Sequence, residues 1–249
     1  IQLEYVRDID ARIDHIGKEI KLVSVEAFSK LVDEFKQLGV KSVVISLLHS
    51  YAYPEHEQKV QAIIKKVFPD FDITLSSDIL SESREYERTL SAALTSLLRP
   101  IMDQHLCFFP ENDLAELSDL WLMQSNGGVT PAQSAIENPL PSTMSGPVAA
   151  VIGMNWISKQ SGVANVITFD VGGTSTDVAL VTDGTVQKKS VTDIGGFSLK
   201  LSSVDVLSIG AGGGSLAFMA QDKRWHVGPD SAGALPGPVC YDRGGEQPT

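Results

Sequence analysis

Cysteine is almost absent from this sequence. Only Cys107 and Cys240 occur among its 249 residues, and neither belongs to a CxxC motif. A disulfide scaffold needs several paired cysteines, and a zinc ribbon needs closely spaced ones, so both classes are excluded. Without such pairs and without a secretory leader, the sequence predicts a protein of the reducing cytoplasm.

Basic residues are also scarce. The chain has 20 Lys and Arg against 31 Asp and Glu, which gives a formal net charge of −11. Proteins that hold phosphate backbones do so with clustered Lys and Arg side chains. The charge balance therefore predicts no nucleic-acid partner.

Long apolar runs are missing as well. The longest weakly charged stretch, residues 131–169, carries only Glu137 and Lys159, but prolines, glycines and polar residues interrupt it. A bilayer-spanning helix needs about 20 consecutive apolar residues, so we expect no membrane partner. With 43% hydrophobic and 20% charged residues, the composition is that of a globular protein with an ordinary core.

What is present is an alternation of helical and strand patterns, which predicts an α/β fold. The expected helices are 24–38, 54–67, 83–98 and 145–160, and the expected strands are 43–48, 72–75, 120–124, 163–169, 177–181, 185–189 and 204–209. In the third helix we expect Tyr86, Leu90, Leu94 and Leu97 to face inward. Short strands dominate after Gly162, which predicts a domain boundary there.

The most informative segment is Val166–Val181, in which an apolar strand leads into an acid, two glycines, three hydroxyl residues and a second acid. Glycine lacks Cβ, so a turn at Gly172 and Gly173 can present backbone N–H groups to phosphate oxygens. Further donors come from the side chains of the next residues, which are Thr174, Ser175 and Thr176. Asp170 is a candidate for binding Mg²⁺, and Asp177 for orienting water or a metal ligand.

Other interpretations of this segment are possible. The glycines could simply form a tight hairpin turn that the Asp and Thr residues cap. A Walker A loop is excluded, because the Gly-Lys-Ser/Thr ending is missing and no lysine lies between Lys159 and Lys188.

A second glycine run follows an expected strand at Gly210–Ser215. Ser215 stands where a dinucleotide fingerprint has its third Gly or Ala, so we do not predict a Rossmann site. We expect Gly212, Gly213 and Gly214 to contact phosphate or substrate. The alternative is a turn that lets two backbones pack closely.

Several segments together resemble the hydantoinase A/oxoprolinase family, in the family's order and over nearly the whole chain. These are residues 47–51, 56–57, 84–88, 123–129, 145–147, 169–178, 210–215 and 227–241. The resemblance implies an actin-like, ribonuclease H-like ATPase fold, with ATP and Mg²⁺ as cofactors. It further implies that residues 1–161 are the remainder of a first ATPase domain with its connection, and residues 162–249 the start of a second one.

The resemblance also implies the activity, which is ATP-driven opening of five-membered cyclic amides such as hydantoins and 5-oxoproline, with a second hydantoinase-type subunit as partner. Alternatives are the ATP-using subunit of a ketone carboxylase and a non-enzymatic, nucleotide-responsive module of the actin or chaperone kind. The segment Asp170–Asp177 would be the second phosphate loop. The family's first loop is absent here, so we expect this piece alone to bind ATP weakly and to be inactive.

Other polar residues carry weaker predictions. His49, His56 and Glu57 could bind a metal, or could simply belong to the start of the helix after Pro54. Residues 84–88 are expected to form an exposed, ion-paired helix turn, with substrate or subunit contact as the alternative. Cys240 has no histidine partner that the sequence identifies, so a nucleophilic role is the less favoured interpretation.

Overall fold

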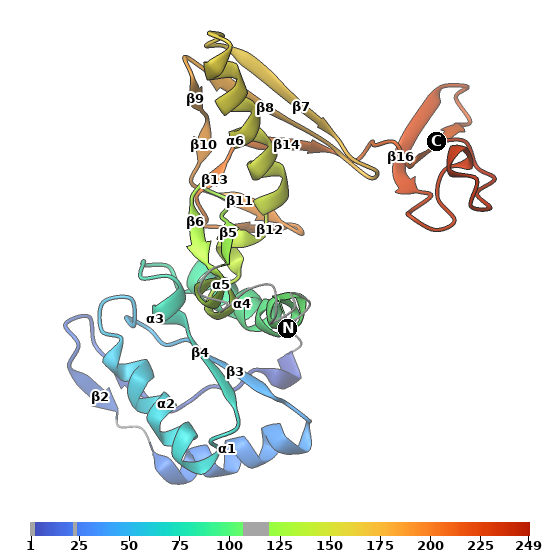
Figure 1. The fold of residues 1–249 in the computed structure, drawn as a ribbon. Coiled ribbons are helices and arrows are strands. Elements are labelled where there is room, and N and C mark those ends of the chain that lie inside the picture. The colour runs from blue at the N-terminus through green and yellow to red at the C-terminus, as the bar shows by residue number, and fades with distance from the viewer. Residues whose placement is uncertain (1–2, 22–23, 107–119) are drawn as a thin grey trace. The chain divides into compact units, whose positions relative to one another are not determined.

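The computed structural model describes residues 3–21, 24–106 and 120–249, so Cys107 lies outside the described residues. These residues form two compact units, drawn in Figure 1. Unit 1 comprises residues 1–121, 130–141 and 191–201, and unit 2 comprises residues 122–129, 142–190 and 202–249. The units are defined by the packing of the chain and do not test the expected boundary between two ATPase domains near Gly162. That boundary stays a prediction.

Unit 1 contains a parallel pair of strands between helices. Its elements are η1 (Leu3–Tyr5), β1 (Arg12–Ile13), β2 (Glu19–Lys21), α1 (Val25–Gln37), β3 (Ser42–Ile45), α2 (Glu55–Val67), β4 (Asp72–Leu75), α3 (Ser76–Ile79), α4 (Glu85–Leu106), α5 (Ala132–Glu137), β11 (Thr192–Ile194) and β12 (Phe197–Leu199). Strands β3 and β4 pair in parallel, with Ile45 opposite Leu75. Helices α1 and α2 cover one face of this pair and α4 lies against the other (Figure 1).

The core of unit 1 follows from the apolar periodicity of α1 and α2. Phe28, Val32 and Phe35 from α1 meet Val60 and Ile64 from α2 over the apolar face of β3 and β4. At the end of α1 the backbone takes a left-handed conformation at Gly39, with φ +70°, which glycine adopts without steric cost. The expected helices at 24–38 and 54–67 and the strand at 72–75 are therefore confirmed.

The prediction for α4 was wrong about its buried face. Tyr86 is 70% exposed and Leu97 is 63% exposed. Apart from Leu106 at the end of the helix, the side chains that α4 does bury are small or polar, at positions 88, 91, 92, 95 and 96. Hydrophobic periodicity indicated the wrong face because the inward side of this helix carries polar residues, among them Arg88, which forms buried hydrogen bonds. The helix also runs beyond the expected Leu98 to Leu106, with Pro100 inside it.

A buried polar network explains that inner surface. The carboxylate of Glu57 accepts hydrogen bonds from Leu47 N at 2.8 Å, Ser76 Oγ at 2.6 Å, Ser77 N at 2.9 Å and Ser77 Oγ at 2.8 Å. Arg88 Nε donates to Ser76 Oγ at 2.9 Å, so one hydroxyl joins the two buried charged groups. Arg88 and Glu57 are both fully buried. Buried charges are tolerated only when they are compensated in this way.

Replacing Ser76 by alanine is expected to lower the free energy of unfolding by about 1–3 kcal/mol, because Glu57 and Arg88 each lose a buried partner. Urea denaturation followed by circular dichroism measures this loss. Ser83→Ala, at an exposed position close by, should change the stability by less than about 0.5 kcal/mol. Equal stability of the two variants would contradict a stabilising role for the network.

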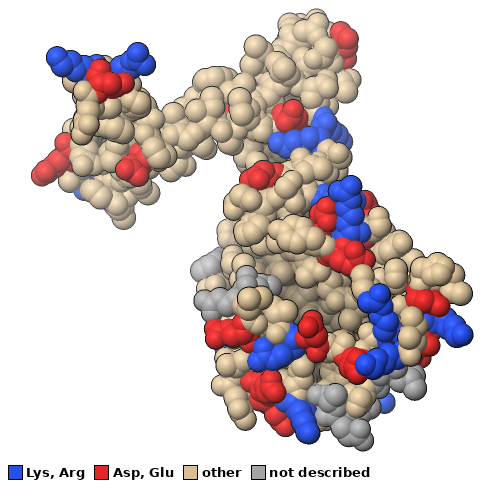
Figure 2. Space-filling view, turned by 180° about the vertical axis from the view of Figure 1, so that it is seen from behind, with Lys and Arg blue, Asp and Glu red and all other residues tan. Residues whose placement is uncertain are grey.

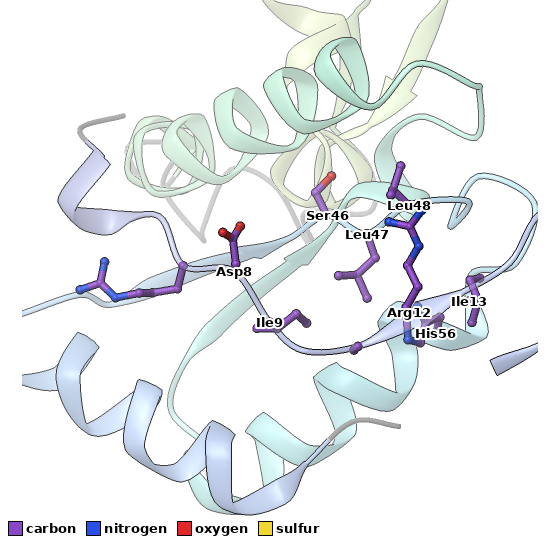
Figure 3. Close-up of a pocket in the computed structure, with 10 residues that line it drawn as sticks. Asp8, Ile9, Arg12, Ile13, Ser46, Leu47, Leu48 and His56 are labelled. Atoms are coloured by element: carbon purple, nitrogen blue, oxygen red, sulfur yellow. The ribbon is translucent and has the colours of Figure 1, made fainter. Parts of the chain in front are cut away.

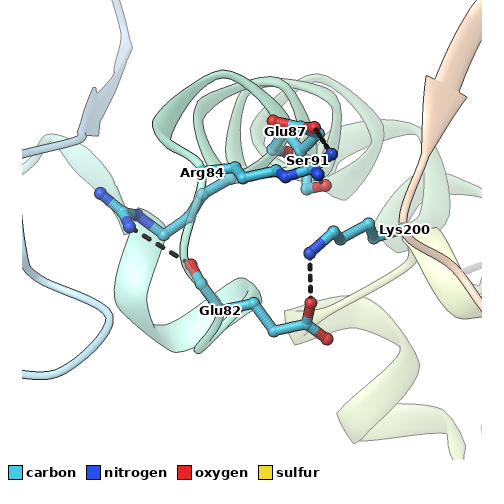
Figure 4. Close-up of polar contacts among 6 residues, drawn as sticks. Glu82, Arg84, Glu87, Ser91 and Lys200 are labelled. Atoms are coloured by element: carbon cyan, nitrogen blue, oxygen red, sulfur yellow. Dashed lines mark hydrogen bonds and ion pairs between the residues drawn. The ribbon is translucent and has the colours of Figure 1, made fainter.

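The expected exposed turn at residues 84–88 is only partly as predicted. Arg84 Nη1 and Glu87 Oε1 are 3.3 Å apart in an exposed ion pair, drawn in Figure 4. The same figure shows a second ion pair, between Lys200 and Glu82. The prediction of an exposed position was wrong for Arg88. The turn lies at the start of α4, where Arg88 is buried and donates to the polar network.

Unit 2 is built on an antiparallel sheet. Its elements are α6 (Ser145–Gln160), β7 (Val166–Val171), β8 (Thr176–Thr182), β9 (Thr185–Val186), β10 (Lys188–Lys189), β13 (Ser203–Val204), β14 (Val206–Ile209), β15 (Ser215–Met219), β16 (Trp225–Ser231) and η4 (Val239–Tyr241). The strand order is β14-β8-β7, with β9 pairing to β8. The chain passes between the units in the β5–β6 pair (Trp121–Met123 and Val129–Pro131), in η3 (Leu140–Ser142), and again after residues 190 and 201.

Helix α6 packs on one face of this sheet. Val148 and Val151 from α6 meet Ala179 from β8 and Val206 from β14. The helix spans the expected residues, and the turn between β8 and β9 lies at Asp183 and Gly184, as predicted. Both turn residues have positive φ, +51° and +68°, which suits a hairpin. The pair β15–β16 was not predicted, because glycines and prolines mask its strand pattern.

The mixture of helices with one parallel pair and several antiparallel pairs confirms a mixed α/β architecture. Among the described residues, none of the helices combines the length and apolarity that crossing a bilayer requires. On the face shown in Figure 2, Lys and Arg side chains are interspersed with Asp and Glu.

Candidate functional site

The candidate site is the turn that joins β7 to β8, at residues 172–175. Strand pairing places Val171 opposite Thr176, and the N–H of Gly172 donates to the carbonyl oxygen of Ser175 at 2.9 Å. The β7–β8 pairing continues without a break to Val171 and Thr176, so the glycines fall at the tip of the hairpin. The tip is therefore a defined backbone turn and has the strand–turn–strand order that the sequence predicts.

The tip is open. Gly172, Gly173 and Thr174 are exposed, and within the described part of the chain the N–H groups of Gly173, Thr174 and Ser175 donate no hydrogen bond. A Cβ built on Gly173 would meet no atom within 4 Å, and one on Gly172 would meet only Ser175 O, at 3.5 Å. Unpaired N–H groups on consecutive residues of a turn can form an anion-binding nest when they converge on one point.

The second glycine run lies directly against this turn. Gly213 N donates to Gly172 O at 3.0 Å, and Gly214 N donates to Gly173 O at 2.6 Å. The hydroxyl of Thr176 donates to Ala211 O at 2.5 Å. The structure thus brings together the two glycine segments that the sequence singled out, through their backbones. Thr176 is buried and links the two loops, whereas Thr174 is exposed at the open tip.

Close backbone contact explains why glycine is needed in the second run. A Cβ on Gly212 would lie 2.6 Å from Gly172 O, 2.8 Å from Gly173 C and 2.8 Å from Ser175 N. All three atoms belong to the backbone, so no side chain can turn aside. Glycine therefore has two roles in this site. At 172 and 173 it keeps the tip open, and at 212 it allows two backbones to lie in close contact.

The two aspartates face each other across the hairpin. Asp170 and Asp177 are direct partners in the β7–β8 pairing, and the hydroxyl of Ser208 donates to the Asp177 carboxylate. Two carboxylates directly opposite each other repel. A cation beside them would relieve that repulsion, and Mg²⁺ is commonly held by one or two carboxylates with water and phosphate oxygens completing its shell. The pair therefore fits Mg²⁺.

Sequence reasoning missed two residues of this site. Ser208 is opposite Asp177 in the β8–β14 pairing, and Ser231 Oγ donates to Gly214 O at 3.2 Å. The strand alternation around Ser208 could have indicated its face, but not which strand would be its neighbour. For Ser231 the sequence offers no signal, because β16 was not predicted.

The alternative metal site at His49, His56 and Glu57 gains no support. The described residues contain no group of three or more His, Cys, Asp or Glu side chains placed to hold an ion. Both oxygens of Glu57 are occupied by the polar network of unit 1. Cys240 is exposed in η4.

His56 is buried, with 3% of its surface exposed, and both ring nitrogens lack a hydrogen-bond partner in the described structure. Burial lowers its pKa below the ordinary value of 6.5, against the opposing effect of the nearby Glu19 carboxylate. The unfolded chain therefore binds a proton more readily than the folded one. Stability should fall as the pH drops from about 7 toward 5.

Urea denaturation at several pH values tests this dependence. In that window the free energy of unfolding should vary less with pH for His56→Gln than for the original protein, because the variant has no imidazole to protonate. Identical pH profiles would show that His56 is accessible to protons in the folded state.

With this geometry defined, the chain can be compared with known proteins. The sequence pattern described as hydantoinase/oxoprolinase matches residues 88–249, and the one described as the hydantoinase/oxoprolinase N-terminal region matches residues 1–68. The chain is 34% identical over 233 residues to 5-oxoprolinase 1 of Arabidopsis thaliana, covering 91% of this chain and 18% of that protein.

Two solved structures are also similar. The ATP-dependent caprolactamase from Pseudomonas jessenii aligns with a TM-score of 0.78 and 33% identity, over 98% of this chain and 36% of that one. The nucleotide-free acetone carboxylase aligns with a TM-score of 0.77 and 28% identity, over 97% of this chain and 35% of that one. The chain thus spans about a third of these structures, and it belongs to the hydantoinase/oxoprolinase family.

Proposed function

We propose that this chain is the nucleotide-binding part of an ATP-dependent hydrolase subunit that opens five-membered cyclic amides of the hydantoin or 5-oxoproline kind. The observation that carries the proposal is the open tip of the β7–β8 hairpin, with its free N–H groups and facing aspartates. Family membership supports the reaction class, since similar proteins are named as a 5-oxoprolinase and a caprolactamase. The actin-like ATPase fold belongs to the same proposal.

In this proposal each part of the site has one task. The N–H groups of Gly173, Thr174 and Ser175 bind phosphate oxygens, and the hydroxyl of Thr174 adds a donor at the exposed tip. Asp170 and Asp177 hold Mg²⁺, which neutralises phosphate charge. The Gly210–Ser215 loop keeps the tip in one conformation. Positioning and charge neutralisation are most of what phosphoryl transfer requires from a protein.

The use of ATP follows from the chemistry of the substrate class. The carbonyl carbon of an unstrained cyclic amide is a poor electrophile, because the amide nitrogen donates electron density to it. Transfer of the γ-phosphoryl group to the carbonyl oxygen, with ADP as the leaving group, creates a better electrophile. Water then adds to the carbonyl carbon, the C–N bond breaks as the nitrogen takes up a proton, and hydrolysis of the resulting acyl phosphate gives the ring-opened carboxylate and phosphate. The chain's own contribution is to hold the phosphate during that transfer.

A second candidate is the ATP-using subunit of a ketone carboxylase. The similarity to acetone carboxylase over 97% of this chain favours it. Both candidates use the same phosphate turn, and they differ in the substrate that receives the activated group. Relatives named as subunits, such as caprolactamase subunit alpha, support a second subunit as partner in either case.

The test is ATP hydrolysis by the complete protein with its partner subunit, measured without substrate, with hydantoin, with 5-oxoproline and with acetone plus bicarbonate. Stimulation by a cyclic amide with release of the ring-opened product is the expected result. Stimulation by acetone and bicarbonate alone would favour the carboxylase. A rate of ATP hydrolysis that is the same with and without each substrate would point instead to a nucleotide-responsive module.

A further inference from the structure

The cavity in unit 1 does not form a second polar site within the described part of the chain. It has a volume of 310 Å³ and is lined by residues 7–9, 11–13, 46–48 and His56, which Figure 3 shows. Both ring nitrogens of His56 are buried beneath other atoms, so a molecule in the cavity cannot reach them. Arg7 and Ser46 are hydrogen-bonded to neighbouring side chains, and Asp8 and Arg12 are exposed. A set of polar side chains that the fold holds together lies instead in unit 2.

Three polar side chains form a row across the sheet of unit 2, next to the phosphate turn. Asp177 in β8 is paired with Asp170 in β7 on one side and with Ser208 in β14 on the other. Directly paired residues point to the same face of a sheet, so the two carboxylates and the hydroxyl lie together on one face. Asp177 is therefore the central member of the row. Asp170 has a neighbour on one side only, because β7 is the last strand in the order of the described sheet.

The polar row lies where the apolar part of this face ends. The next row away from the turn is buried, and α6 packs on it. Its members are Thr168, Ala179 and Val206. In the polar row, Asp170 and Ser208 are exposed and Asp177 is half-buried. The three polar side chains are thus fixed to a packed sheet at their backbones and are open to solvent at their ends.

Ser208 contributes a hydrogen bond to this row and little packing. It is the one hydroxyl residue of β14, whose other side chains are apolar. Leu207 and Ile209 point to the opposite face of the sheet, because side chains alternate along a strand. The hydroxyl of Ser208 donates to Oδ1 of Asp177. Among the side chains that the structure describes, none donates to the carboxylate of Asp170, so the two aspartates have different surroundings.

This hydrogen bond restricts how the Asp177 carboxylate can turn. Two like charges directly opposite each other repel, which favours orientations that separate them. Ser208 binds one oxygen of Asp177 and leaves the other oxygen with all of its acceptor capacity. A partner that orients a metal-binding side chain in this way typically changes metal affinity by about 10- to 100-fold.

We propose that Ser208 is a positioning residue of the phosphate turn: its hydroxyl holds Asp177 in one orientation and thereby sets the affinity of the two aspartates for Mg²⁺. Ser208 itself binds neither the metal nor the phosphate. This role rests on the function proposed above. It places the control of metal affinity in β14, the strand that leads directly into the Gly210–Ser215 loop.

Crystal structures of the complete protein without metal or nucleotide test the orientation of Asp177 by itself. The original protein and Ser208→Thr, which keeps the hydroxyl on a residue that suits a strand, should show Asp177 in one orientation. In Ser208→Ala the carboxylate should turn or occupy several orientations. An unchanged, single orientation of Asp177 in Ser208→Ala would overturn the proposal. Because no nucleotide is present, this result does not depend on the proposed hydrolase activity.

Metal affinity is measured with Mn²⁺ in place of Mg²⁺, by electron paramagnetic resonance of the complete protein with ADP. Ser208→Ala should raise the dissociation constant of Mn²⁺ by about 10- to 100-fold, and Ser208→Thr should restore it to within a few-fold. In ATP hydrolysis, Ser208→Ala should need more Mg²⁺ for half-maximal turnover by a similar factor, while turnover at saturating Mg²⁺ changes only a few-fold. A merely structural role would lower the melting temperature and leave the metal constants unchanged.

Ser202→Ala is the matched control, because it makes the same substitution at another exposed position of unit 2 and should equal the original protein in every measurement. Equal Mn²⁺ affinity of Ser208→Ala and the original protein would overturn the positioning role and leave the phosphate turn as a metal site. Failure of the original protein to bind Mn²⁺ with ADP would refute the proposed function, and the role of Ser208 with it. The two failures are therefore distinguishable.

Discussion

Gly212→Ala is expected to lower the ATP turnover of the complete protein by about 100-fold, because the added methyl group has no space. Its Cβ would lie 2.6–2.8 Å from three backbone atoms of residues 172–175. Real Cβ atoms do not approach so closely, so the Gly210–Ser215 loop and the hairpin tip must move apart. The hydrogen bonds from Gly213 and Gly214 to the tip would then be lost, and the phosphate-binding N–H groups would no longer be held in position.

The neighbouring glycine provides a matched control. A Cβ on Gly213 would lie 3.8 Å from Gly172 O, which is ordinary van der Waals contact. Gly213→Ala adds the same methyl group to the same loop, one residue away, and should keep turnover within a few-fold of the original. Comparable losses in both variants would mean that the loop needs glycine for its flexibility and not for close packing against the tip.

Thermal denaturation checks that the effect is local. The Gly210–Ser215 loop lies outside the hydrophobic core of unit 2, which is formed by α6, β8, β13 and β14. We therefore expect both variants to remain folded, with Gly212→Ala losing at most a few degrees. A collapse of the fold in Gly212→Ala alone would show that the contact between the two loops stabilises the whole unit.

The elements that the sequence predicted well are those whose signals are local. The apolar spacing of α1 and α2, Gly39 after α1 and the Asp183-Gly184 turn all lie within one element or one turn. For α4, the apolar pattern indicated the wrong face because the helix buries Arg88 and small residues against a network from other segments. Tertiary hydrogen bonding overrode periodicity there.

The same distinction applies to the candidate site. An acid, two glycines and hydroxyl residues in sequence were enough to locate the turn at 172–175. The contact with Gly212 depends on how β14 and the following loop return to the hairpin, which no local pattern encodes. Ser208 became part of the site through that same strand pairing. Which glycine tolerates a side chain could therefore be learned only from the structure.

Asp170→Asn is the second change for which we expect a large effect, a loss of ATP turnover of about 100- to 1,000-fold in the complete protein. The substitution keeps the size of the side chain and removes the negative charge that would hold Mg²⁺. Losing one charged ligand beside a transferred phosphoryl group removes several kcal/mol of electrostatic stabilisation. ATP hydrolysis at several Mg²⁺ concentrations measures the loss, which excess metal should relieve in part.

In the absence of metal, Asp170→Asn should keep or raise the melting temperature although it lowers turnover. This combination separates a metal-binding role of Asp170 from a structural role. Asp170 lies directly opposite Asp177, so removing one charge relieves repulsion worth about 0.2–1 kcal/mol. The variant should melt at or above the temperature of the original protein in EDTA, whereas added Mg²⁺ and ADP should stabilise only the original. Asp183→Asn, at the opposite end of β8 in a turn that asparagine also suits, should leave both turnover and melting unchanged. If Asp170→Asn instead melted lower in EDTA while keeping its turnover, Asp170 would be a residue of the fold, and the phosphate turn would have to bind its metal elsewhere.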